Sequence, residues 1–395
     1  MQNVYDLTAI YHAFVPPLLA ELAATPEMER LQRVGMNCGC EYTSFPRFAN
    51  GGTYSRFVHS LGVGLIVWHF TGSPAQAAAG LLHDIATPPF AHVVDFLRGD
   101  YLTQEATEDG TRERIDGSRS IQAILKRYGL TTEDVSDYHR YPIADNDSPR
   151  LSADRLEYTL GNALRWDFLT REEIAAIYSD LRVGTNEEGL PELVFQDLSL
   201  ASAFARAALR CSKVYVSDED RYSMQALCEL IGKALKTGVL SPADLDGDEP
   251  SLIDKLEASP LSADWRTFRA LHRTERAETP PAAQATGNGQ QATGDGRRGS
   301  FDFAALRSGR QDRNGSAAGT AICPPGSAPV SSAMRANCPP VSPPDDRPWR
   351  QIPAKKRRID PLVERNGRVS MLDTVFAADL AAFLADPQTE WVLGE

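Results

Sequence analysis

The feature that most constrains this chain is the adjacent pair His83-Asp84, which closes an apolar run at residues 75–82. The run is rich in alanine and leucine, so it predicts a buried helix, and the prolines at 88 and 89 bring that helix to an end. Two polar side chains are therefore carried into the interior. An ionised carboxylate buried without a partner costs several kcal/mol, and a metal ion would satisfy both residues at once.

Two further segments supply polar side chains of the same kinds. His59 lies in the apolar segment 55–67, which predicts a second buried helix with an inward-facing histidine. Asp154 follows Ser152, a residue type favoured at helix N-caps, so it is expected in the first turn of a third helix. Two imidazoles and two carboxylates suit a divalent transition metal (Mn, Fe, Co, Ni or Zn) better than calcium or magnesium. The predicted metal ligands are His59, His83, Asp84 and Asp154.

In this order, the motifs resemble those of the HD-domain phosphohydrolases, and most of all those of the deoxynucleoside triphosphate triphosphohydrolases. The resemblance is carried by Arg56-Phe57-x-His59-Ser60-Leu61-Gly62, by Leu82-His83-Asp84-Ile85 with Pro89-Phe90-Ala91-His92 and Asp95, and by Asp154-Arg155-Leu156-Glu157-Tyr158. A looser similarity runs from about residue 29 to about residue 256. The resemblance implies a helical HD-domain core built around the metal.

Around the metal, members of this family use further residues to contact phosphates or to move protons. The resemblance implies phosphate binding for Arg56, and the alternative for Arg56 is a salt bridge to an acidic neighbour. His92 and Asp95 are three residues apart, so both are expected on one helical face that lines the phosphate pocket. The catalytic residues implied by the match are Asp84 (as ligand or base), His92, Asp95 and Glu105.

The chain departs from the family's pattern at several expected substrate-binding positions. Thr87 and Gln104 stand where the family carries histidines, and neither can act as a general acid near neutral pH. Either the catalytic residues named above transfer the proton, or catalysis is slow. Tyr158 matches the tyrosine that the family places against the sugar, but Asn162 replaces an aspartate that usually bonds a sugar hydroxyl. An asparagine side chain can both donate and accept a hydrogen bond, so the contact with the sugar is retained while the negative charge of the aspartate is lost.

The function implied by the resemblance is metal-dependent hydrolysis of a nucleotide, in which water attacks phosphorus. The expected substrate is a (deoxy)nucleoside triphosphate, and Mg²⁺ accompanying its phosphates is an additional candidate ion. Two alternatives stay open: a nucleoside mono- or diphosphate phosphatase of the same superfamily, and a nucleotide-binding regulatory or sensor protein with weak or no catalysis. The family frequently forms multimers, so a homo-oligomer is expected.

Composition fits a soluble enzyme. Of the 395 residues, 42% are apolar, and no run approaches the ~18 apolar residues of a transmembrane helix. The first residues lack a basic stretch followed by an apolar one, so we expect a cytoplasmic protein with no membrane association. The net charge of −12 disfavours broad binding to nucleic acid. Cys38-Gly39-Cys40 is the one close cysteine pair, and we expect it to be reduced.

A change of composition after residue 276 predicts three parts. Residues 1–276 are expected to form the HD-domain core with a helical extension. From 277 to 347, glycine, alanine, serine and proline dominate, which predicts a disordered insertion. Residues 348–395 predict a hairpin and a helix packed on the core, with strands at 352–363 and 368–370 around Asn366-Gly367.

A basic tetrad, Lys355-Lys356-Arg357-Arg358, falls in the first of these predicted strands, and related triphosphohydrolases carry a comparable basic strand before an Asp-Pro. Two interpretations stay open: contact with phosphates of a substrate or effector in a neighbouring subunit, or a solvated strand edge.

Elsewhere, apolar residues recur at helical spacing in 174–177, 198–209 and 224–235. The fold class is therefore all-α: an HD-domain helical core with a minor C-terminal β-hairpin. The family has substrate-contacting residues in the third quarter of its fold, which makes further candidates of Arg210, Lys213, Tyr215 and Tyr222.

Overall fold

The computed structural model describes residues 7–49, 54–98, 110–278, 349–350, 352 and 355–395. All the described residues belong to one compact unit, which spans Met1–Pro281 and Pro348–Glu395. The predicted insertion at 277–347 falls almost entirely outside the described residues, so its expected disorder and the domain boundaries stay predictions.

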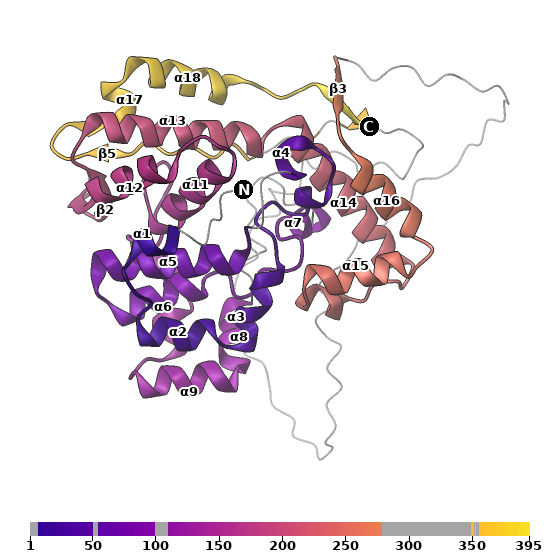
Figure 1. Ribbon diagram of the computed structural model, residues 1–395, viewed down its shortest axis with the longest axis horizontal. Helices are drawn as coiled ribbons and strands as arrows, with labels where there is room; N and C mark the ends of the chain where they lie inside the picture. Colours follow the sequence, from indigo (N-terminus) through magenta and orange to yellow (C-terminus); the bar gives the residue numbers. More distant parts are fainter. Residues whose placement is uncertain (1–6, 50–53, 99–109, 279–348, 351, 353–354) are drawn as a thin grey trace, which may run out of the picture. The chain divides into compact units, whose positions relative to one another are not determined.

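Most of the described chain is helical, as the sequence predicts (Figure 1). The helices are α1 Thr8–Tyr11, α2 Pro17–Ala23, α3 Pro26–Glu29, η2 Arg30–Arg33, η3 Cys40–Tyr42, α4 Pro46–Ala49, α5 Arg56–Thr71, α6 Pro74–Leu82, α7 Val93–Arg98, α8 Thr111–Gly117, α9 Arg119–Arg127, α10 Thr132–Val135, η4 Tyr138–Arg140, α11 Ala153–Arg165, α12 Arg171–Asp180, α13 Leu198–Tyr215, α14 Asp218–Lys236, η5 Pro242–Asp246, α15 Glu249–Glu257, α16 Ser262–Ala270, α17 Val369–Leu372 and α18 Thr374–Ala385.

Helices α5 and α6 form the centre of the core and are joined by a tight turn. Gly72, with φ 61°, ends α5 in the left-handed conformation, and Ser73 caps α6 by accepting a hydrogen bond from a backbone N–H of its first turn. Glycine also allows the two helices to pack closely. A Cβ added at Gly64 would lie 3.1 Å from Leu81 Cβ, a separation tighter than ordinary packing.

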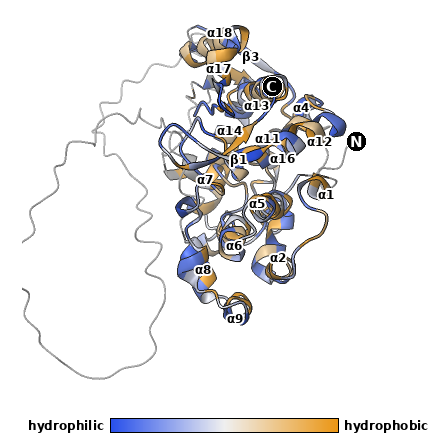
Figure 2. Ribbon diagram, turned by 90° about the vertical axis from the view of Figure 1, so that its left-hand side faces the viewer, coloured by the Kyte–Doolittle hydropathy of each residue, from blue (hydrophilic) through white to orange (hydrophobic). Residues whose placement is uncertain are grey.

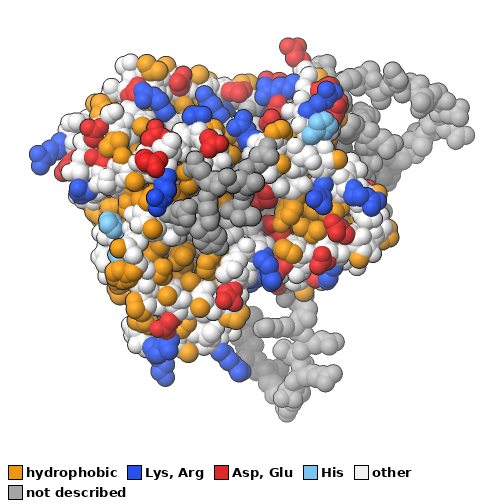
Figure 3. Space-filling model, viewed as in Figure 1, with side chains coloured by type: hydrophobic (Ala, Val, Ile, Leu, Met, Phe, Trp, Pro, Cys, Tyr) orange, Lys and Arg blue, Asp and Glu red, His pale blue; other side chains and the backbone are white. Residues whose placement is uncertain are grey.

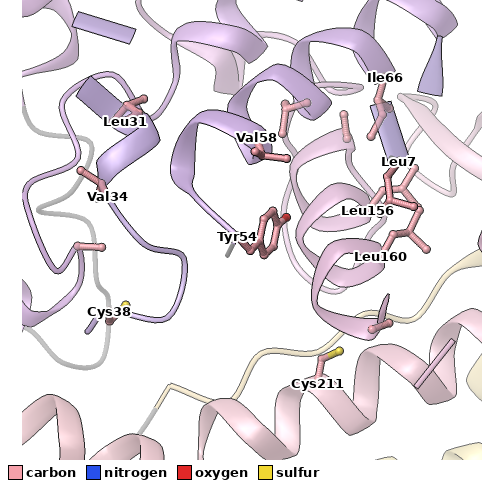
Figure 4. Packing of buried hydrophobic residues seen from close by; sticks show 14 of the residues in the cluster. Leu7, Leu31, Val34, Cys38, Tyr54, Val58, Ile66, Leu156, Leu160 and Cys211 are labelled. Atoms are coloured by element: carbon pink, nitrogen blue, oxygen red, sulfur yellow. The ribbon is translucent and has the colours of Figure 1, made fainter. Parts of the chain in front are cut away.

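Helix α11 packs against α5 on one side and against α13 on the other. Its side chains Leu156 and Leu160 point towards Leu7 and Ile66, and all four are buried (Figure 4). Along the helices, hydrophobic and hydrophilic residues alternate as expected for elements with one buried and one exposed face (Figure 2). This packing places the first turn of α11 next to the first turn of α5.

The β-structure forms two small sheets. In the first, β1 (Arg182–Thr185) pairs antiparallel with β2 (Pro191–Phe195), and β2 pairs parallel with β5 (Leu362–Val363). With β6 (Gly367–Arg368) at its edge, this sheet has the order β1-β2-β5-β6. In the second, β7 (Trp391–Gly394) lies between β3 (Thr274–Ala277) and β4 (Trp349–Arg350). The second sheet was not predicted from the sequence, because its strands are short and lie on either side of the segment 279–348.

The predicted hairpin is present but shorter than expected. Strand β5 pairs antiparallel with β6 (Gly367–Arg368), and Arg365, with φ 64°, lies in the turn between them. The prediction of a strand over the basic tetrad was wrong: residues 355–361 have no regular secondary structure. Their backbone is bonded elsewhere, since Asp360 N donates to Pro149 O and Ser148 Oγ donates to Arg358 O. These bonds hold the segment beside the loop that precedes α11.

On the face drawn in Figure 3, acidic and basic side chains are interspersed between hydrophobic patches. None of the helices within the described ranges combines the length and the apolar character that crossing a membrane requires.

Candidate metal centre

The four predicted ligands come from the ends of three helices. His59 lies in the first turn of α5, His83 and Asp84 directly follow α6, and Asp154 lies in the first turn of α11. Ser152 caps α11 as predicted, since its Oγ accepts a hydrogen bond from a backbone N–H of that first turn. The helix ends carry the polar groups, while the apolar faces pack between the helices.

The ligand atoms converge. His59 Nε2 lies 3.0 Å from Asp154 Oδ1 and 3.8 Å from Asp84 Oδ2. His83 Nε2 lies 3.5 Å from Asp84 Oδ2 and 3.7 Å from Asp154 Oδ1. Neighbouring ligands held at about 2.0–2.2 Å from one ion lie about 2.8–3.6 Å from each other in octahedral or tetrahedral geometry. Among the described residues, the cluster whose ligand atoms all lie within 4.8 Å of one another consists of His59, His83 and Asp154. Asp84 is not part of that cluster, and it joins the group through its contacts with the two histidines.

Both imidazoles are oriented by a hydrogen bond at the ring nitrogen that faces away from this point. His83 Nδ1 lies 2.7 Å from the backbone oxygen of Gly80, and His59 Nδ1 lies 2.6 Å from Glu157 Oε2. A carbonyl or carboxylate partner keeps the proton on Nδ1, which leaves Nε2 as the ligand atom. The donor set and its orientation fit a divalent transition metal.

The electrostatics of the cluster favour a cation. Burial alone would raise the pKa of Asp154, but the hydrogen bond and charge of His59, with the charge of His83, lower that pKa to about 2. Burial alone would lower the pKa of His59, but Asp154 and Glu157 raise it to about 10. The carboxylates therefore stay ionised, and a metal entering the site must displace the Nε2 proton of His59.

Both carboxylate oxygens of Asp84 have a partner, one in an ion pair and one in a hydrogen bond. Burial by itself would raise the pKa of Asp84, but Arg56 and the two histidines hold that pKa well below its usual range. Arg56 Nη1 lies 3.0 Å from Oδ2, and Thr87 Oγ1 donates a hydrogen bond of 2.7 Å to Oδ1. The salt-bridge interpretation of Arg56 is therefore confirmed, and its contact with phosphate stays a prediction. Thr87 is fully buried, and the contact that the structure gives its hydroxyl is to Asp84.

Glu157 is a site residue whose role sequence reasoning missed. It is fully buried, three residues after Asp154 on α11, and Tyr54 OH also donates a hydrogen bond to its Oε2. Glu157 approaches helix α5 at Gly62, where only a glycine leaves room, because a Cβ at Gly62 would lie 2.6 Å from Glu157 Cγ. The available signal was the spacing of Glu157 from Asp154, which places both on one helical face.

His92 does not lie on the helix that carries Asp95, so the expectation of both residues on one helix was wrong, and the pairing of their side chains stays a prediction. Helix α7 begins at Val93, and His92 precedes it in a turn in which Phe90 and Ala91 have positive φ angles of 60° and 44°. The turn breaks the helical register that a three-residue spacing assumes. The side chain of Asp95, together with Gln104 and Glu105, lies outside the described residues.

Tyr158 and Asn162 lie one and two helical turns beyond Asp154 on α11, so the three share a face. Asn162 Nδ2 donates to Tyr215 OH at 2.9 Å, which places Tyr215 at this face. Asn162 Oδ1 is buried, and no described residue bonds it. The remaining candidates lie elsewhere: the Arg210 guanidinium is 3.9 Å from the centre of the Phe168 ring, Arg350 covers Tyr222, and Lys213 is exposed.

Two distant residues hold the loop that follows the His83-Asp84 pair. Arg30 Nη2 donates to the backbone oxygens of Ile85, at 3.0 Å, and Thr87, at 2.8 Å. Glu249 Oε1 accepts the Phe90 N–H at 3.1 Å. Sequence reasoning missed both residues because nothing in their local pattern indicates a contact so far along the chain.

Comparison with known proteins gives relatives at modest identity. The chain is 26% identical over 206 residues to the uncharacterized protein YdhJ of Bacillus subtilis, which covers 52% of this chain and 62% of that protein. It is 27% identical over 235 residues to the metal-dependent phosphohydrolase cns2 of Cordyceps militaris, with 56% and 63% covered. The deoxynucleoside triphosphate triphosphohydrolase SAMHD1 of Mus musculus is 27% identical over 163 residues, with 34% and 24% covered.

The chain thus spans about three-fifths of the length of the first two relatives and about a quarter of the third. No protein-family model matches it. The relatives confirm the resemblance that the motifs predict: the chain is similar to the HD-domain metal-dependent phosphohydrolases and, among them, to the deoxynucleoside triphosphate triphosphohydrolases.

Proposed function

We propose that this chain is a metal-dependent phosphohydrolase that acts on a nucleotide, with a (deoxy)nucleoside triphosphate as the first substrate to test. The observation that carries the proposal is the convergence of His59, His83, Asp84 and Asp154. The names of the relatives support the same reaction class.

The four ligands would hold the cation through His Nε2 and carboxylate oxygens. A divalent cation supplies two things when bound: a water of lowered pKa and withdrawal of charge from a phosphoryl oxygen. Asp84 stays ionised beside Arg56, so it can accept a proton from an attacking water or serve only as a ligand. Thr87 fixes the orientation of Asp84, which makes it a positioning residue.

Tyr158 and Asn162 continue the ligand face of α11 and would contact the sugar of the nucleotide. Asn162 brings a buried amide oxygen without a partner among the described residues, and this oxygen can accept a hydrogen bond from a hydroxyl. His92 is the candidate for proton transfer to the leaving group, because neither Thr87 nor Gln104 can supply an acidic proton near neutral pH. The roles of Asp95 and Glu105 stay predictions.

The test is hydrolysis by metal-depleted protein that is reconstituted separately with Mn²⁺, Fe²⁺, Co²⁺, Ni²⁺, Zn²⁺ or Mg²⁺. Each form is incubated with deoxy- and ribonucleoside mono-, di- and triphosphates, and the products are identified by mass. We expect release of phosphate, pyrophosphate or triphosphate that His83→Ala abolishes. The matched control is His272→Ala, which removes an exposed histidine outside the site.

A nucleotide sensor is the second candidate, favoured by Thr87, whose hydroxyl is bonded to Asp84 where the family has a histidine. Binding of a nucleotide to the metal-loaded protein without turnover would support the sensor and contradict the hydrolase. Equal turnover by the wild type and His83→Ala would exclude the proposed metal chemistry.

A further inference from the structure

The basic tetrad sends one of its four side chains to the candidate site within the same chain. Arg357 Nη2 lies 3.5 Å from His92 Nε2, and the Arg357 guanidinium lies 6.0 Å from the centre of the Tyr158 ring. Tyr158 is one helical turn from the metal ligand Asp154. Arg357 follows the segment 279–348, yet it lies beside His92 and Tyr158, which belong to the first two-fifths of the chain.

The neighbours of Arg357 in the basic tetrad have other surroundings. Lys356 Nζ donates to the backbone oxygens of Phe383, at 2.7 Å, and Leu384, at 3.1 Å, so it caps the C-terminal end of α18. Arg357 points the other way, towards α11, and Arg358 is exposed.

The segment is held in this position by bonds on both sides of Arg357. Arg221, buried in α14, donates from Nη1 to Ile352 O at 2.6 Å, and Asp360 N donates to Pro149 O at 2.9 Å. In Figure 4 the pale yellow C-terminal segment passes between the helix that carries Leu156 and Leu160 and the helix that carries Cys211. The position of the guanidinium is therefore set by the fold rather than by a free chain end.

The charge of Arg357 acts on the buried side chains of Tyr158 and Asp220. Burial raises the pKa of Tyr158 to about 12 although the Arg357 charge acts in the opposite direction, and burial raises the pKa of Asp220 to about 8 against the same charge. Arg56, another guanidinium near the candidate ligands, lies 3.0 Å from Asp84 Oδ2. In a chain with a net charge of −12, an anionic ligand needs such a local cation.

We propose that Arg357 is a phosphate-binding residue of this site, supplied in cis by the C-terminal segment. Its planar fork of N–H donors can grip two oxygens of one phosphate while Tyr158 contacts the rest of the nucleotide. The inference rests on the proposed function and adds a residue to it. It also replaces the strand-edge interpretation of Arg357, since residues 355–361 have no regular secondary structure, and it assigns the phosphate contact to the site of the same chain.

The experiment compares the wild type with Arg357→Ala and Arg357→Lys. Steady-state hydrolysis of the best nucleotide substrate gives KM and kcat, and calorimetric titration of the metal-loaded proteins with inorganic tripolyphosphate gives binding without turnover. A charge-assisted bond to phosphate is worth about 10- to 100-fold in affinity. We expect Arg357→Ala to raise both KM and the tripolyphosphate Kd by that factor, and Arg357→Lys to lie between it and the wild type.

The matched control is Arg358→Ala, which removes the same charge from the next residue, whose side chain is exposed. Metal content and the thermal unfolding midpoint of each variant show whether the fold and the metal site persist. Unchanged KM and Kd in a folded, metal-loaded Arg357→Ala would overturn the inference, as would an equal effect of Arg358→Ala. If the wild type hydrolyses no nucleotide, the proposed function fails by itself, and the tripolyphosphate titration still decides whether Arg357 binds phosphate.

Discussion

His59 Nδ1 lies 2.6 Å from Oε2 of Glu157, a fully buried carboxylate 98 residues further along the chain. The contact joins the first turn of α5 to α11 and turns His59 Nε2 towards Asp84 and Asp154. A carboxylate behind a metal-binding histidine fixes the ring and makes it a stronger ligand. The candidate metal centre thus depends on a residue that binds no metal itself.

Glu157→Gln tests this dependence. The substitution keeps the shape of the side chain and removes its charge, so we expect metal affinity to fall by about 10- to 100-fold, as for other partners of metal-binding histidines. Titration with Mn²⁺ or Co²⁺, read by calorimetry, measures the change. Glu172→Gln, at an exposed position of α12, is the control. An unchanged metal affinity in Glu157→Gln would contradict this role.

Gly62→Ala should damage the same contact from the opposite helix. The new Cβ would lie 2.6 Å from Glu157 Cγ, so one of the two helices must shift. We expect a loss of unfolding free energy of about 1–3 kcal/mol, together with weaker metal binding. Gly117→Ala is the matched control, since a Cβ there meets nothing within 4 Å. Chemical denaturation of both variants measures the difference, and equal stabilities would show that the close approach is not needed.

Thr87→Val removes the hydroxyl that donates to Asp84 while keeping the volume of a fully buried side chain. Asp84 Oδ1 then loses its donor, so we expect a cost of about 1–3 kcal/mol in stability. Metal affinity should fall as well, because Asp84 is less well oriented. Thr87→Ser keeps the hydroxyl and should retain most of both properties. If Thr87→Ser is as impaired as Thr87→Val, packing rather than the hydrogen bond is what matters.

Glu249 makes stability depend on pH. Burial, followed by the nearby Glu41 charge, raises the pKa of Glu249 to about 8 in the folded protein, against a usual value of about 4.3 in an unfolded chain. Between these values the folded state binds the proton and the unfolded state does not, so this group makes the protein less stable as pH rises from about 4.3 to 8. Below about pH 4 both states bind the proton, and the contribution of Glu249 is constant.

Glu249→Gln mimics the protonated side chain and should flatten this part of the stability profile. Its amide oxygen can still accept the N–H groups of Gly35 and Phe90. Denaturation in urea at pH 5, 6, 7 and 8 measures the profile, with Glu364→Gln, at an exposed position of the hairpin turn, as the control. A fall in stability with pH that is as steep in Glu249→Gln as in the wild type would exclude Glu249 as its source.

The local sequence determined the helices of the core and pointed to the candidate ligands. Apolar periodicity predicts α5, α6 and α11, and Ser152 and the prolines after Asp84 mark the ends at which the ligands lie. These signals are local because capping groups and helix breakers act within one or two turns. Four polar residues of the right types, each at the edge of an apolar helix, are therefore recognisable without coordinates.

Only the tertiary structure decided which residues support those ligands. Glu157 bonds His59, Thr87 bonds Asp84, and Arg357 reaches His92, and each pair depends on how helices or loops pack rather than on local pattern. The sheet around β7 escaped prediction for the same reason, since its strands pair across a long separation in sequence. Periodicity shows which face of an element is buried, but packing alone determines what that face meets.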